Sequence, residues 1–213
     1  AIVLAAGSGT RMSSQLPKVL HQVSGAPIIS HVFDSLNQVD INKVILVTNP
    51  ENNNALSQID PEISCVIQNT PLGTGNAVSV AYENASSFEN TIIINGDHPL
   101  ITRKTIQNLI SKHSESNSTL TLVSAVVDNP QGYGRIKKEN DIVTEIVEQK
   151  ELSEENEKLT DINVGIYAVK TQWLNKALLL LEPHDNEEYF ITDIVNLATQ
   201  QKISINTYEL KKS

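Results

Sequence analysis

Two cations close behind a glycine-rich loop are the residues best suited to chemistry in this sequence. Arg11 and Lys18 follow a loop of small residues around Gly7, and Pro17 fixes the backbone just before the lysine. Backbone N–H groups, a forked guanidinium and an ammonium together suit a polyphosphate. The simpler alternative is a strand-to-helix turn with two surface cations. The spacing fits neither a dinucleotide-binding fingerprint, which needs a third glycine where Met12 stands, nor a P-loop, which needs glycine before its lysine.

A buried strand must position this loop, because the apolar run Ile2, Val3 and Leu4 leads directly into it. Apolar runs then alternate with segments of helical spacing. The predicted strands are 2–4, 44–47, 65–67 and 91–94, and the predicted helices are 27–36, 52–58, 76–85 and one from about 102. This alternation predicts an α/β fold, a doubly wound, mainly parallel, Rossmann-like sheet.

Polar residues follow two of these strands. Gln68 ends the strand at 65–67 and precedes a loop with Gly73 and Thr74, while Asp97 follows the strand at 91–94. An amide can pair with a donor and an acceptor on a nucleobase, and a carboxylate can bind a hard divalent cation. Alone, either loop is more simply a turn or a helix cap. Because parallel strands end at one edge of a sheet, we expect phosphate, base and metal loops to converge there.

The second part of the chain, from about residue 116, has a different pattern of polar and apolar residues. Gly134, Glu148 and Asn163 stand beside predicted strands, and residues 148–158 are dense in charge, as in a solvated loop or helix. From the residues alone, Glu148 is more simply a surface group. The other predicted elements are strands at 119–127, 142–147 and 203–208 and helices at 171–181 and from 187 to about 200.

Composition excludes several classes of partner. The 213 residues carry 16 Lys and Arg against 25 Asp and Glu, a net charge of -9, so nucleic acid and anionic membranes are poor candidates. The single cysteine, Cys65, cannot form an internal disulfide, which fits a reducing compartment. No apolar run approaches the ~18 residues of a membrane span. We therefore expect a soluble cytoplasmic protein.

The stretch LAAGSGTRMSSQLPKVLH resembles the signature of the sugar-1-phosphate nucleotidyltransferases. Its LPKVLH part is most similar to the uridyltransferase half of the bacterial bifunctional N-acetylglucosamine-1-phosphate uridyltransferase and glucosamine-1-phosphate acetyltransferase family. The likeness continues to about Ile194. It implies a nucleotidyltransferase domain over 1–213, with a nucleotide-binding part at about 1–115 and a small sugar-binding lobe at about 116–213.

The resemblance also implies an activity: Mg²⁺-dependent formation of UDP-N-acetylglucosamine and pyrophosphate from UTP and N-acetylglucosamine 1-phosphate, for peptidoglycan and lipopolysaccharide precursors. His98 departs from the apolar residue expected after Asp97, and we interpret it as a packing residue rather than a ligand. The implied site residues are Arg11 and Lys18 for catalysis, Leu4, Ala5, Ala6, Gly7, Gln68, Gly73 and Thr74 for the nucleotide, Gly134, Glu148 and Asn163 for the sugar, and Asp97 for the metal.

Three alternatives remain at this level. The chain could act on another sugar or base, be a metal-dependent glycosyltransferase, for which the Arg11 and Lys18 loop has no purpose, or be a non-catalytic nucleotide-sensing module. In the family, a C-terminal β-helix of hexapeptide repeats carries acetyl transfer and implies a trimer for the full-length protein. No such repeat occurs here, so we expect that domain to be absent from these residues. The family's second metal ligand, an asparagine, is expected beyond Ser213.

Overall fold

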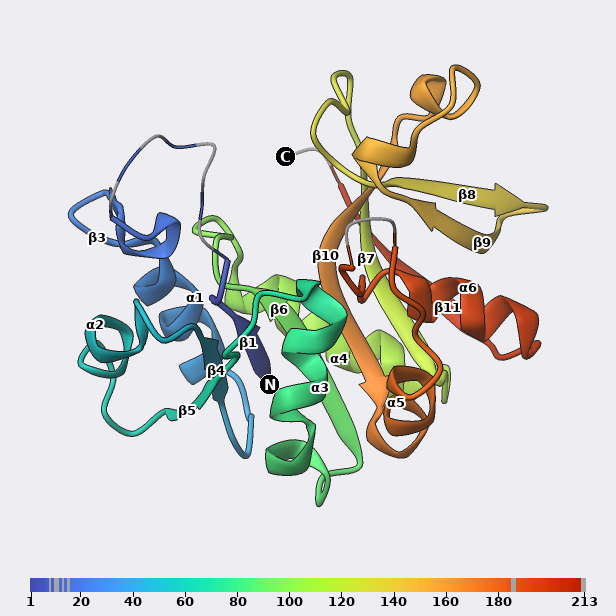
Figure 1. The fold of residues 1–213 in the computed structure, drawn as a ribbon. Coiled ribbons are helices and arrows are strands. Elements are labelled where there is room, and N and C mark those ends of the chain that lie inside the picture. The colour runs from blue at the N-terminus through green and yellow to red at the C-terminus, as the bar shows by residue number, and fades with distance from the viewer. Residues whose placement is uncertain (8, 10–11, 13, 15, 185–186, 212–213) are drawn as a thin grey trace.

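The computed structural model describes residues 1–7, 9, 12, 14, 16–184 and 187–211 of the chain. Its centre is a nine-stranded sheet in which seven strands follow the order β11-β7-β10-β6-β1-β4-β5 (Figure 1). β1 (Ile2–Leu4) lies between β4 (Ile45–Thr48) and β6 (Asn90–Asn95), parallel to both, and β5 (Ser64–Ile67) continues the parallel array beyond β4. The carboxyl ends of these four strands therefore share one edge, as predicted.

The second part of the chain extends the same sheet. β10 (Asp161–Lys170) runs antiparallel to both β6 and β7 (Leu120–Val126), and β11 (Ile205–Leu210) pairs in parallel with β7. The antiparallel hairpin β8 (Arg135–Glu139) and β9 (Ile142–Val147) is attached to β10 and projects from the sheet (Figure 1). A separate two-stranded ribbon, β2 (Gln22–Val23) and β3 (Ala26–Pro27), precedes α1.

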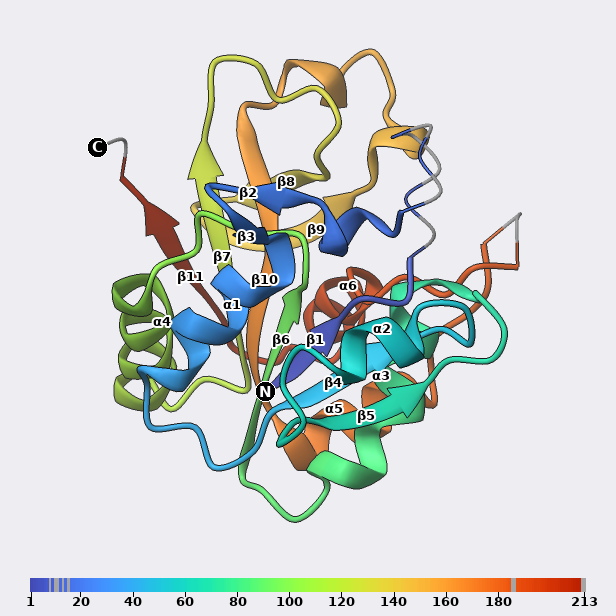
Figure 2. The same cartoon turned by 90° about the vertical axis from the view of Figure 1, so that its left-hand side faces the viewer.

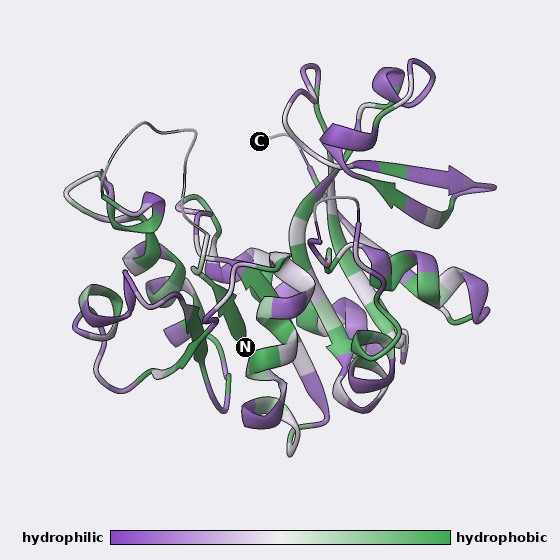
Figure 3. Cartoon of the chain, in the orientation of Figure 1, coloured by the Kyte–Doolittle hydropathy of each residue, from purple (hydrophilic) through white to green (hydrophobic). Residues whose placement is uncertain are grey.

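Helices cover both faces of the sheet because its central strands are apolar on both sides. One buried cluster joins Ile2 and Ile93 to α3 (Gly73–Ala85), α5 (Thr171–Leu178) and α6 (Asp193–Gln200). The other joins Val3 and Ile94 to α1 (Ile28–Asn37), α2 (Asn53–Ser57) and α4 (Arg103–Glu115). Figure 2 looks towards the α1 side, and Figure 3 shows apolar colour concentrated along the central strands. The doubly wound, mostly parallel fold is confirmed.

Some predicted boundaries were wrong for local physical reasons. The last helix does not include residues 187–192; α6 begins at Asp193, because the preceding segment uses its backbone groups to contact the loop before α3. The charged stretch after β9, predicted as a solvated loop or helix, is a loop with two 3-10 turns, Gln149–Glu151 and Asn156–Lys158. Thr102, and not Asp97, caps α4: its hydroxyl oxygen accepts the Thr105 N–H. No helix among the described residues is long and apolar enough to cross a membrane.

Candidate active site

The loop that follows β1 is fixed by side-chain amides from the end of the neighbouring strand. The Asn52 amide donates to the carbonyl of Ala5, and the Asn49 amide donates to that of Ala6, each at 2.9 Å. The Ala5 N–H in turn donates to the carbonyl of Val47 at 2.8 Å. These contacts orient the backbone from Leu4 to the exposed Gly7, the stretch predicted to meet the nucleotide. A Cβ on Gly7 would contact no heavy atom of the described residues within 4 Å, and Gly7 is exposed.

Lys18 and Asp97 meet at this edge. Lys18 lies on a 3-10 turn, Lys18–Leu20, and its Nζ is 2.6 Å from Oδ2 of Asp97, which follows β6. Gly96 attaches the Asp97 loop to β1 by donating its N–H to the carbonyl of Leu4 at 2.8 Å. Gly9 packs so closely on the lysine that a Cβ there would lie 2.9 Å from Lys18 Cβ. The structure thus places the predicted cation beside the predicted metal ligand. Arg11 lies outside the described residues.

Gln68 is buried, with 4% of its surface exposed, and its amide has a fixed orientation. Its Nε2 donates one hydrogen to the carbonyl of Gly73 at 3.0 Å and the other to Oδ1 of Asn76 at 2.7 Å. Both amide hydrogens are therefore used inside the protein, and Oε1 is left to accept. The sequence predicted that this amide could both donate to and accept from a base. In the structure only Oε1 is available, so the amide can only accept.

The loop before α3 contacts a second segment, residues 187–192, which we call the connecting segment. Tyr189 donates its N–H to the carbonyl of Leu72 at 2.9 Å and accepts the Gly75 N–H at 2.7 Å. A Cβ at Gly73, where φ is +86°, would lie 2.5 Å from the Tyr189 carbonyl oxygen. The hydroxyl oxygen of Thr74 accepts the N–H of Ile191 at 3.0 Å. These glycines admit the connecting segment, a packing role that the sequence did not reveal.

The three predicted sugar residues come together beside the β8–β9 hairpin. Asn163 donates its N–H to the carbonyl of Gly134 at 2.9 Å. A Cβ at Gly134 would lie 3.5 Å from the carbonyl oxygen of Val147, the residue before Glu148. The pairing of β10 with β7 is irregular between Asn163 and Tyr167, where the backbone bulges.

The Asn163 side chain is oriented by its own strand. Its Nδ2 donates to the hydroxyl of Tyr167 at 2.7 Å, and its Oδ1 accepts the Gly165 N–H at 3.0 Å. Tyr167 is fully buried, and burial raises the pKa of its phenol, so the hydroxyl stays neutral.

Glu148 is a largely buried carboxylate rather than a surface group. Its Oε1 accepts the hydroxyl of Thr192, at the start of α6, at 2.9 Å. Burial raises the pKa of Glu148, and the charges of Glu151 and Asp193 raise it further, whereas the Thr192 hydrogen bond and the charge of His184 lower it. Thr192 belongs to the connecting segment, so this segment joins the Gly73 loop to the carboxylate of Glu148.

His98 is partly buried next to Asp97, the predicted metal ligand. Burial lowers its pKa, the charge of Lys18 lowers it further and that of Asp97 opposes both, so the imidazole is neutral. Its Nε2 is buried and has no hydrogen-bond partner among the described residues. A Cβ at Gly165 would lie 3.5 Å from this nitrogen and 2.6 Å from the amide nitrogen of Asn95. The interpretation of His98 as a packing residue stays a prediction.

Several residues that build the site were not predicted from the sequence. Asn49 and Asn52 orient the loop after β1, Tyr167 orients Asn163, and Thr192 contacts Glu148. Asparagines just after a strand are a signal that could have indicated the first pair. The contact between Thr192 and Glu148 joins residues 44 positions apart, so no local pattern contains it.

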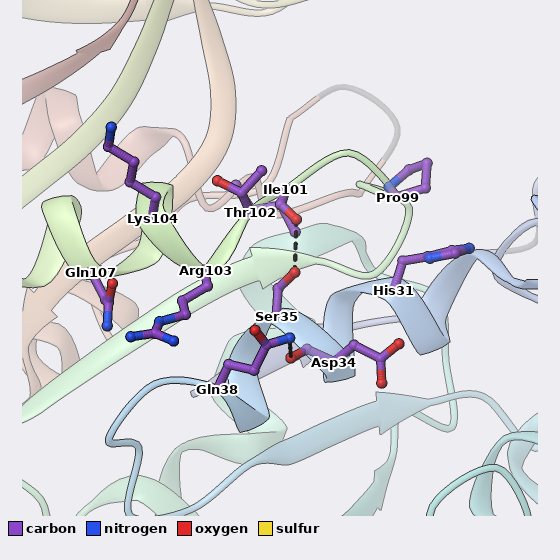
Figure 4. Close-up of a pocket in the computed structure, with 10 residues that line it drawn as sticks. All are labelled: His31, Asp34, Ser35, Gln38, Pro99, Ile101, Thr102, Arg103, Lys104 and Gln107. Carbon is purple, nitrogen blue, oxygen red and sulfur yellow. Dashed lines mark hydrogen bonds between the residues drawn. The ribbon is translucent and has the colours of Figure 1, made fainter.

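A cavity of about 610 Å³ lies away from these residues, between α1 and the start of α4 (Figure 4). Two of its polar groups bond to backbone carbonyls, Ser35 Oγ to Ile101 at 2.8 Å and Gln38 Nε2 to Asp34 at 2.9 Å. Figure 4 shows the charged ends of Asp34, Arg103 and Lys104 pointing in different directions. Because its charges do not converge on one point, we do not place the reaction there.

Comparison with known proteins agrees with this geometry. The family model described as nucleotidyl transferase matches residues 1–213. The chain is 38% identical over 214 aligned residues to the bifunctional protein GlmU of Streptococcus thermophilus, covering 99% of the chain and 46% of that protein. It is 40% identical to the bifunctional protein GlmU of Lactococcus lactis, covering 92% and 44%. The chain thus spans about half the length of the curated relatives it matches.

A solved structure from Bacillus anthracis, provisionally assigned as a glucose-1-phosphate thymidylyltransferase, superimposes with a TM-score of 0.76 over 99% of this chain and 86% of that one. At 20% identity, this likeness concerns the fold alone. The match of the family model along the whole chain is what establishes the relationship. The chain belongs to the nucleotidyl transferase family.

Proposed function

We propose that the chain transfers a uridylyl group, converting UTP and N-acetylglucosamine 1-phosphate to UDP-N-acetylglucosamine and pyrophosphate, in the cytoplasm and for cell-envelope precursors. The observation that supports this most is the contact between Lys18 and Asp97, residues 79 positions apart. Phosphoryl transfer needs a cation for the phosphate charge and a carboxylate for a divalent metal, side by side. The relatives named GlmU support the same class of reaction.

The chemistry requires no general base. The attacking atom is an oxygen of the sugar phosphate, which is already anionic. It forms a bond to the α-phosphorus of UTP while the bond from that phosphorus to the bridging oxygen of pyrophosphate breaks. The protein must align the attacking oxygen and stabilise the charge that develops on the leaving group. We assign this stabilisation to Lys18 and to Arg11.

Asp97 would bind Mg²⁺ together with phosphate oxygens of the substrate and water. When bound, the ion neutralises negative charge on the phosphates. The donor set fits this arrangement: the Asp97 side chain is 30% exposed, and the described residues contain no cluster of three or more His, Cys, Asp or Glu that could hold a metal. A single carboxylate suits an ion that arrives with phosphate ligands, because Mg²⁺ usually keeps waters and substrate oxygens in its shell.

The two substrates would be recognised by different parts of the chain. For the nucleotide, we place Oε1 of Gln68 opposite N3 of uracil, where it can accept the N3–H. For the sugar, we assign the carboxylate of Glu148, the amide of Asn163 and the backbone at Gly134, since carboxylates and amides offer directional bonds to hydroxyl and acetamido groups. The connecting segment contacts both the Gly73 loop and Glu148, and so lies between the two binding regions.

A pyrophosphate-release assay tests the proposal by crossing four nucleoside triphosphates with a panel of sugar 1-phosphates in the presence of Mg²⁺. We expect the highest kcat/KM for UTP with N-acetylglucosamine 1-phosphate. A higher value for another pair would assign a different sugar or base. Absence of release with every pair, in a chain that still binds nucleotide, would identify a non-catalytic nucleotide-binding module.

A further inference from the structure

His184 lies between two carboxylates next to the proposed sugar site. Its Nδ1 is 2.6 Å from Oε1 of Glu151, and its Nε2 is 2.8 Å from Oδ2 of Asp193. The ring also packs on Phe190, with 4.4 Å between ring centroids, and 26% of the side chain is exposed. An ionised carboxylate can only accept, and a neutral imidazole has one donor, so only the protonated ring satisfies both contacts.

The surroundings of His184 favour this protonated form. Partial burial lowers the pKa of the imidazole, but the hydrogen bonds and charges of Asp193 and Glu151 outweigh it, and the pKa lies above its usual 6.5. Among the described residues, the charged groups nearby also include Glu148 and the ion pair of Lys150 with Glu188, whose Nζ and Oε2 atoms are 3.8 Å apart. His184 is therefore a positive charge among several carboxylates.

Both partners of His184 belong to short segments that flank Glu148. Glu151 ends the 3-10 turn that begins directly after Glu148. Asp193 follows Thr192, whose hydroxyl donates to Oε1 of Glu148. By contacting both segments, the imidazole fixes the distance between the turn that follows Glu148 and the helix start that orients its carboxylate. Without His184, Glu151 and Asp193 would be two uncompensated negative charges beside a largely buried third.

We propose that His184 is a positioning residue for sugar binding, which ties the turn after Glu148 to the start of α6 and so fixes the Glu148 carboxylate. The inference rests on the proposed function in one respect, that Glu148 contacts the sugar. The contacts of His184 with Glu151 and Asp193 exist in the ligand-free protein. Two measurements, one without substrate and one with it, therefore separate failure of this inference from failure of the proposed function.

The substrate-free measurement is an NMR titration of the Glu148 carboxyl carbon in the intact chain. His184→Gln removes a positive charge near Glu148, so we expect the Glu148 pKa to rise above its wild-type value. Lys150→Gln, which removes a charge from the same region but leaves the imidazole contacts intact, should change it much less. A Glu148 pKa that is the same in wild type and His184→Gln would overturn the inference, whatever reaction the chain catalyses.

The substrate measurement is the KM for N-acetylglucosamine 1-phosphate as a function of pH. In the wild type this KM should increase as pH rises through the raised His184 pKa, because loss of the proton breaks one of the two contacts. At neutral pH, His184→Gln should raise the sugar KM by about tenfold, the effect of one lost charge-assisted hydrogen bond. The alkaline increase should disappear, and kcat and the KM for UTP should stay nearly constant.

A double-variant comparison distinguishes positioning from general stability. If His184 and Thr192 both act through Glu148, adding His184→Gln to Thr192→Val should raise the sugar KM by less than the product of the separate effects. A purely structural role predicts instead that kcat falls with the folded fraction and that the alkaline increase persists. Either that pattern or an unchanged sugar KM would overturn the inference. A wild-type chain without turnover would refute the proposed function, while the carboxyl titration would still decide the role of His184.

Discussion

If the proposed function holds, selection of the base depends on the Gln68 amide, whose orientation is fixed by two hydrogen bonds. Gln68 Nε2 donates to Gly73 at 3.0 Å and to Asn76 at 2.7 Å, so a flip would break two hydrogen bonds. Each contributes about 1 kcal/mol net, so the flip costs about 2 kcal/mol. Uracil offers N3–H to Oε1, whereas the N3 of cytosine is an acceptor and would require the flipped amide. We therefore expect UTP to be preferred over CTP by about 30-fold in kcat/KM.

Two substitutions should lower this selectivity to different degrees. Gln68→Ala removes the acceptor and should lower the preference for UTP to within a few-fold. Asn76→Ala leaves the acceptor but removes one of the two bonds that fix it, so the flip costs about 1 kcal/mol and the preference falls to about fivefold. Ser79→Ala is the matched control, because this exposed residue lies on the same helix and its hydroxyl donates to the Gly75 carbonyl, not to Gln68.

The assay is pyrophosphate release at subsaturating UTP or CTP, with the same sugar 1-phosphate in every reaction. The reasoning fails if Gln68→Ala lowers kcat/KM equally for both triphosphates, because the amide would then support the loop without reading the base. It also fails if Asn76→Ala leaves the preference at its wild-type value, since the orientation of the amide would not depend on this bond. A wild-type preference for CTP would show that Oε1 does not face N3.

Three further predictions concern the remaining parts of the site. Lys18→Ala should lower kcat by about 100-fold, or ~3 kcal/mol, with little change in either KM, and a raised KM at unchanged kcat would remove the lysine from the mechanism. Burial raises the pKa of Glu148 above the usual 4.5, so its carboxylate is protonated at a higher pH than a free one. The sugar KM should therefore increase as pH falls towards this raised pKa. In a profile of KM against pH, Glu148→Gln should abolish this acid-side increase. Gly73→Ala should lower the free energy of unfolding by about 2 kcal/mol or more, measured as a Tm lowered by ~5 °C. Gly132→Ala is the control: its φ is similar, +89°, but its Cβ would lie in open space, so only the backbone strain should lower the stability.

The sequence determined the parallel part of the sheet and the positions of the loops that follow it. β1, β4 and β6 are short apolar runs bounded by polar or small residues. Such runs predict strands of a parallel sheet, because helices cover both faces of such a sheet and its strands are therefore mostly apolar. Parallel strands end at the same edge, so Lys18 and Asp97 could be expected together before their 2.6 Å contact was seen.

The tertiary structure decided the environment of each candidate residue. Glu148 looked like a surface group in a charged stretch, but much of it is covered, and the hydroxyl of Thr192, 44 positions away, donates to its carboxylate. Gly73 looked like a turn glycine, and its neighbour is the backbone of Tyr189. His184 had no recognisable role, because its two carboxylate partners are 33 and 9 positions away. Local sequence patterns indicate helices, strands and turns. They do not indicate these contacts, because the contacts form only when the chain folds and brings distant segments together.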